Sequence, residues 1–208
     1  MNTKQTEATT NSRLFNKNIL SVAVATAMFG GGIASAATSY LGTSAIVTGD
    51  LTTNYVLGNA TVLTISGGTS ETSYLSGFNG TVDGNHTTAG VGGDGNIVIA
   101  GNLTMNGNIG STNTTGNFTL NAGNTLVLSD NVTTFNTANM SLKGNTVLNL
   151  GNATSGYNRS SGNALTMNAN ITMASNSTIN IGNGTTITGD VVGASSGQGT
   201  VNIIGNFT

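Results

Sequence analysis

Pairs of apolar residues separated by a single polar residue recur along the second half of the chain at a fixed offset of 22. A spacing of two puts both side chains of a pair on one face of a β-strand. A fixed period in the twenties is typical of a solenoid, in which each coil buries its apolar side chains against the coils on either side. The matching pairs are Phe118/Leu120 with Met140/Leu142, Leu126/Leu128 with Leu148/Leu150, and Ile179/Ile181 with Val201/Ile203.

The strand spacing refines this expectation to a fold class. Strand starts step by eight and eight residues from Ile171 to Ile179 to Ile187, and then by about six. We therefore expect an all-β parallel β-helix, or β-solenoid, of about 22 residues per coil with three short strands per coil. Gly-Asn pairs such as Gly123-Asn124 and Gly144-Asn145 fit the corners, because both residue types tolerate left-handed backbone angles. Equivalent asparagines, such as Asn180 and Asn202, could also stack their side-chain amides along the axis.

Two intervals interrupt the pattern within the expected solenoid region, residues 37–208. Residues 66–95 are rich in Gly, Ser and Thr and show no sustained alternation, so we expect a long loop inserted into one coil. Residues 152–163 are expected to form a second loop insertion. Beyond it the offset is expected to become 23, which aligns Leu148 with Ile171.

Residues 1–36 have the pattern of a secretory signal peptide. A polar leader precedes an apolar stretch from Ile19 to Ile33, and Ala34-Ser35-Ala36 provides the small residues of a cleavage site. A membrane anchor is the alternative, but this stretch is shorter than the roughly 20 residues that span a bilayer. We expect an exported protein, located at a bacterial cell surface or outside the cell, with no transmembrane helix in the mature chain.

Charge narrows the possible partners. The chain carries a formal net charge of −2, and removing the leader with its three cations and one carboxylate leaves −4. Lys143 and Arg159 are then the only cations of the mature sequence. So few cations cannot neutralise a run of phosphates, so we expect no nucleic-acid partner.

The carboxylates do not suggest catalysis. Hydrolases need an acid and a base that flank the scissile bond, but Asp50, Glu71, Asp83, Asp94, Asp130 and Asp190 are not clustered at coil spacing. Asp83, His86 and Asp94 share the first insertion and could form a metal site, although solvated loop residues are the simpler interpretation. Residues 92–96 resemble one calcium-binding glycine-aspartate repeat, but such sites need tandem copies. We therefore expect no catalytic residues, no metal and no cofactor.

Both insertions carry residues that could contact a partner: Tyr74 and Phe78 in the first, and Tyr157 and Arg159 in the second. Aromatic and arginine side chains often anchor protein interfaces. The alternative is that the aromatic rings pack on the side of the solenoid. The chain also stops in mid-pattern at Thr208, which suggests a fragment of a longer protein and an open coil edge able to self-associate.

The long leader and the Asn-, Gly- and Thr-rich coils, with phrases such as residues 186–191 and 199–203, resemble the passenger domains of rickettsial surface cell antigen autotransporters, the outer-membrane protein B type among them. The resemblance covers most of residues 37–208 and implies a type V secreted passenger that acts as an adhesin or a protective surface layer. Its partners would be a host-cell receptor or neighbouring surface proteins, and outer-membrane anchoring would need a C-terminal barrel in a longer parent. A β-helical enzyme acting on polysaccharide and a self-assembling surface-layer subunit are the alternatives.

Overall fold

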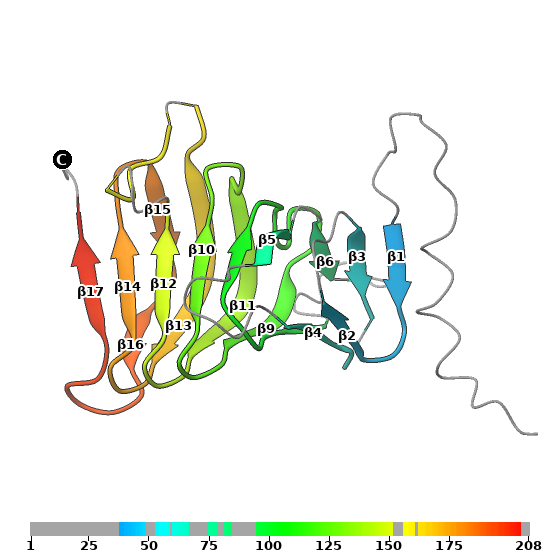
Figure 1. Cartoon of the computed structure of the whole chain (residues 1–208), viewed down its shortest axis with the longest axis horizontal. Coiled ribbons are helices and arrows are strands. Elements are labelled where there is room, and N and C mark those ends of the chain that lie inside the picture. Colours follow the sequence, from blue (N-terminus) through cyan, green and yellow to red (C-terminus); the bar gives the residue numbers. More distant parts are fainter. Residues whose placement is uncertain are drawn as a thin grey trace, which may run out of the picture. The chain divides into compact units, whose positions relative to one another are not determined.

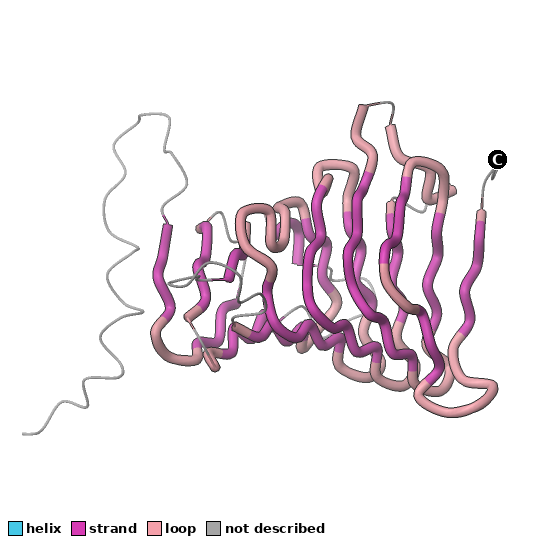
Figure 2. Tube along the Cα trace, turned by 180° about the vertical axis from the view of Figure 1, so that it is seen from behind, coloured by secondary structure: helices cyan, strands magenta, loops and turns pink. Residues whose placement is uncertain are grey.

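The computed structural model describes residues 38–48, 53–58, 60–66, 75–78, 81–84, 95–151, 156–160 and 162–204. These residues form strands, turns and loops without a helix, and the strands pair in parallel in three stacked sheets (Figures 1 and 2). The expected leader, residues 1–36, lies outside the described residues.

As the chain winds from coil to coil, its strands belong to three different sheets. The first contains β1 (Thr38–Leu41), β3 (Asn54–Leu57) and β6 (Val82–Gly84). The second contains β2 (Ala45–Thr48), β4 (Val62–Ser66), β7 (Asn96–Ile99), β9 (Thr115–Leu120), β11 (Thr134–Leu142), β13 (Leu165–Met173), β15 (Thr185–Thr188) and β16 (Val191–Gly193). The third contains β5 (Leu75–Phe78), β8 (Leu103–Met105), β10 (Thr125–Leu128), β12 (Val147–Leu150), β14 (Thr178–Ile181) and β17 (Thr200–Ile203).

The long strands β11 and β13 each belong to two rows of strands, one through their first part and one through their last part. The first part of β13 pairs with β15, and its last part pairs with β16. Ile109 forms parallel bridges to both Val82 of β6 and Phe135 of β11, so the first sheet continues into the opening part of β11. The described residues are thus arranged as three rows of parallel strands, the arrangement of a β-solenoid.

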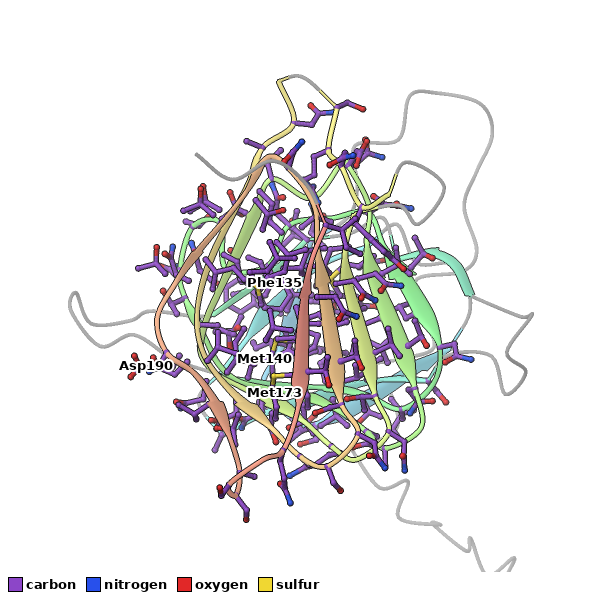
Figure 3. All side chains as sticks on the ribbon, turned by 90° about the vertical axis from the view of Figure 1, so that its left-hand side faces the viewer. Phe135, Met140, Met173 and Asp190 are labelled. Atoms are coloured by element: carbon purple, nitrogen blue, oxygen red, sulfur yellow. The ribbon has the colours of Figure 1, made fainter. Side chains whose placement is uncertain are left out.

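The three sequence repeats at offset 22 are confirmed as strand pairs. Phe118 pairs with Met140, Leu126 with Leu148, and Ile179 with Val201. Along each strand apolar and polar side chains alternate, and the apolar ones fill one continuous core (Figure 3). Phe135, Met140 and Met173 lie inside that core, whereas Asp190 lies on the outside.

The expected offset of 23 after the second insertion is wrong. Leu148 pairs with Ile179 rather than with Ile171, and Ile171 pairs with Met140. The asparagines that flank these pairs, Asn149 and Asn180, are 31 residues apart. The second insertion therefore lengthens its coil by far more than one residue, while the strands on either side of it keep their register.

The first interval is also more regular than the sequence suggested. Residues 66–95 were expected to form a loop, yet they contain β5 and β6. β6 pairs with β3, and the side chain of Val82 is fully buried in the core. This part of the interval therefore builds the solenoid, and the rest of the interval, apart from residues 66, 81 and 95, lies outside the described residues.

Candidate functional site

The second insertion is the best-defined part of the expected partner-binding surface. Of the four residues proposed there, Tyr74 lies outside the described residues, and Phe78 ends β5 without a described side chain. Tyr157 is half-buried with a left-handed backbone (φ 62°). Arg159 is only 8% exposed. The guanidinium of Arg159 is used inside the fold, and the contact of this residue with a partner stays a prediction.

Arg159 inserts its guanidinium among backbone carbonyls at the end of β10 and in the loop that follows it. Its Nη2 donates to Ser129 O at 2.8 Å and to Val132 O, and its Nη1 donates to Leu128 O at 3.4 Å. Its Nε donates to Asn163 O at 2.9 Å, within the second insertion itself. A planar guanidinium with five donors suits such a set of acceptors, because it can bind several at once. Sequence reasoning missed this cradle, since backbone carbonyls carry no residue signature.

Burial and a neighbouring charge have opposite effects on the pKa of Arg159. Burial lowers the pKa of Arg159, whereas the negative charge of Asp130 raises it. The Asp130 carboxylate also accepts hydrogen bonds from Ser160, from Oγ at 2.8 Å and from the backbone N at 3.3 Å. Its other oxygen is buried and has no hydrogen-bond partner within the described part of the chain. Asp130 and Arg159 therefore tie the second insertion to the loop after β10.

The carboxylates in the described residues lie on separate elements. Asp83 is in β6 and accepts a hydrogen bond from Thr112 N at 2.9 Å, Asp130 follows β10, and Asp190 is exposed between β15 and β16 (Figure 3). Within these described segments, no group of three or more His, Asp or Glu could hold a metal ion. His86 and Asp94 lie outside them, so the structure does not bear on the metal-site hypothesis in the first insertion.

Asparagine side chains form ladders that run from coil to coil. Asn180 Nδ2 donates to Asn149 Oδ1 at 2.7 Å, and Asn202 Nδ2 donates to Asn180 Oδ1 at 2.9 Å. The expected stacking of Asn180 and Asn202 is confirmed. Ladders of this kind bond each amide to the coils above and below it. Three more ladders or pairs are Asn96–Asn117–Asn139, Asn136–Asn168 and Asn145–Asn176.

Fold and side-chain arrangement define the class of this protein as a parallel β-solenoid with amide ladders and a pinned lateral insertion. None of the known protein-family models, curated proteins or solved structures matches the chain. Among the described residues there is no helix long and apolar enough to cross a membrane.

Proposed function

We propose that this chain is a surface-exposed or secreted β-helical passenger that acts by contact, as an adhesin or as part of a protective surface layer. The observation that carries the proposal is the fixed attachment of a lateral insertion to a ladder-bonded scaffold with few charged residues. Such a scaffold displays a loop in one conformation, which lowers the entropy cost of binding a partner. Within this proposal a coil without an insertion has about 22 residues, and the longer coils carry the displayed segments.

Three of the charged side chains in the described residues support a contact function over a catalytic one. Asp83 accepts hydrogen bonds from Ser111 and Thr112, and Asp130 accepts them from Ser160. Arg159 is engaged by backbone carbonyls. These groups stabilise local structure, and a polysaccharide-acting enzyme would instead need two carboxylates facing one substrate.

Self-assembly is a second candidate, favoured by apolar side chains in the last described coil. Val191 continues the core row of Ile171 and is 40% exposed, while Val201 and Ile203 continue the row of β14 and are 42% and 59% exposed. Uncovered strands with apolar side chains pair readily with other strands. In this version of the proposal, the coil edge packs against another copy.

The contact function can be tested with the chain secreted under its own leader. We expect the mature protein to begin at Ala37, and beads coated with it to bind cultured animal cells, with binding reduced in Tyr157→Ala and retained in Thr119→Ala. Bead binding no better than that of an uncoated control would contradict the adhesin proposal. Release of sugar from polysaccharides would favour the enzyme, and ordered growth in sedimentation would favour the surface-layer subunit.

A further inference from the structure

The second insertion contacts three successive coils, or turns, of the solenoid, although it belongs to only one of them. The segment Gly156–Ser160 together with Gly162–Asn163, which we call the strap, lies between β12 and β13 and projects past the ends of neighbouring strands (Figure 1). The Arg159 side chain reaches back to the loop at residues 128–132. Its backbone N donates forward to Asn183 O at 3.0 Å. The strap therefore bridges the preceding and the following turns.

The backbone of the strap is packed so closely that two glycines are required beneath it. A Cβ added to Gly151 would lie 2.4 Å from Tyr157 O, and one added to Gly182 would lie 2.2 Å from Tyr157 C. Asn158 Oδ1 accepts a hydrogen bond from Asn183 N at 3.0 Å. Gly151 and Gly182 follow strands of adjacent turns, so Tyr157 is fixed over two turns at once.

Partial opening of the strap is unfavourable because it would leave buried backbone carbonyls without hydrogen-bond donors. Leu128 and Val132 have no exposed surface, and their carbonyls accept hydrogen bonds from Arg159. A buried carbonyl that loses its donor is left unsatisfied, which is unfavourable, and bonds to charged donors are stronger than bonds to neutral ones. Withdrawing the guanidinium breaks these bonds together, because one planar group makes all of them.

We propose that the strap is a latch, with Arg159 as its positioning residue, and that it opens and closes as one unit that locks three turns of the solenoid together and holds Tyr157 in place. This inference stands on the geometry of the strap and does not depend on the proposed adhesin function. Local opening of such units is what hydrogen exchange measures.

Hydrogen exchange of the full chain tests the latch, with Arg159→Ala and Arg159→Lys compared with Lys143→Ala, which changes an exposed cation. In Arg159→Ala we expect protection to fall roughly tenfold or more in peptides that cover residues 128–132, 156–160 and 182–184. Residues 96–120 keep their protection. Arg159→Lys is also impaired, because an ammonium cannot reproduce the planar set of donors.

Chymotrypsin gives a second readout, because opening exposes the bond after Tyr157. We expect faster cleavage there in Arg159→Ala than in Lys143→Ala. Ser160→Ala, which removes the bond to Asp130, keeps the proposal testable if Arg159→Ala fails to fold, and it should loosen the same three segments about threefold. Loss of protection confined to residues 156–160, or spread evenly over the chain, would overturn the latch, as would unchanged exchange.

Discussion

The rings of Phe118 and Phe135 meet edge to face in the centre of the solenoid, with 5.0 Å between their centroids and 62° between their planes. Phe118 comes from β9, whereas Phe135 comes from the opening part of β11 and is bridged to Ile109. Both side chains are fully buried. The contact therefore joins two rows of strands across the core, in addition to the backbone pairing along each row.

A double-mutant cycle will measure this contact. Phe118→Leu and Phe135→Leu should each cost less than the about 3–5 kcal/mol of a buried Phe→Ala change, and the double variant should reveal a coupling of about 0.5–1.5 kcal/mol. Urea denaturation followed by circular dichroism gives the free energies of unfolding. Purely additive losses would mean that the rings contribute only their separate burial.

Removing the central member of the amide ladder should destabilise two inter-coil contacts together. Asn180 bonds to both Asn149 and Asn202, so Asn180→Ala should lower the free energy of unfolding by about 1–3 kcal/mol. Asn131→Ala is the matched control at an exposed position, expected to change stability by less than about 0.5 kcal/mol. Equal effects of the two variants in thermal denaturation would contradict a stabilising role for the ladder.

Adding a single methyl group under the strap should be damaging. Gly182→Ala would place a carbon atom within 2.2 Å of the Tyr157 backbone, and we expect a loss of about 1–3 kcal/mol in denaturant titration. Gly144→Ala is the control, because the nearest atom to its added carbon, Ser175 O, is 3.5 Å away. Neither glycine has a left-handed backbone, so the comparison isolates steric contact. A tolerated Gly182→Ala would show that the strap can lift away.

Stability should fall at alkaline pH through Tyr55. Burial raises the pKa of Tyr55 above its ordinary value of 10.0, although a hydrogen bond with Thr53 partly lowers it. The stabilisation is fully present below pH 10, and it is lost as pH rises because the unfolded state releases its proton first. In melting curves, Tyr55→Phe should flatten this loss above about pH 10, where the unfolded state begins to release its proton. Parallel curves for wild type and Tyr55→Phe would contradict the assignment.

The sequence predicted the fold wherever neighbouring coils differ little in length. The pairing of Phe118 with Met140 follows directly from the offset of 22, since the apolar pattern of one strand is repeated in the next. Across residues 152–163 the same pattern predicted the wrong pairing, that of Leu148 with Ile171. Ile171 and Ile179 both begin apolar-polar-apolar triplets, so the apolar pattern alone allows either to follow Leu148. In the structure Ile179 does, in the register that also joins Asn149 to Asn180.

The role of Arg159 could not be predicted for a different reason. A lone cation in a polar loop gives no sign of burial, and its acceptors are main-chain carbonyls of Leu128, Ser129 and Val132. Sequence patterns report side chains, whereas this site is made by the course of the backbone. The adhesin, enzyme and surface-layer hypotheses remain predictions for the experiments above.

The asparagine ladder shows that the distance between neighbouring coils does not depend on coil length. Asn149 and Asn180 are 31 residues apart and Asn180 and Asn202 are 22 apart, yet their bonds are 2.7 Å and 2.9 Å long. Spatial spacing between coils is thus independent of the number of residues that connect them. A coil of this protein can gain a segment at its corner without disturbing the coils beyond, so a foreign peptide can be grafted at such a corner if the strap residues Tyr157 and Arg159 are kept in place.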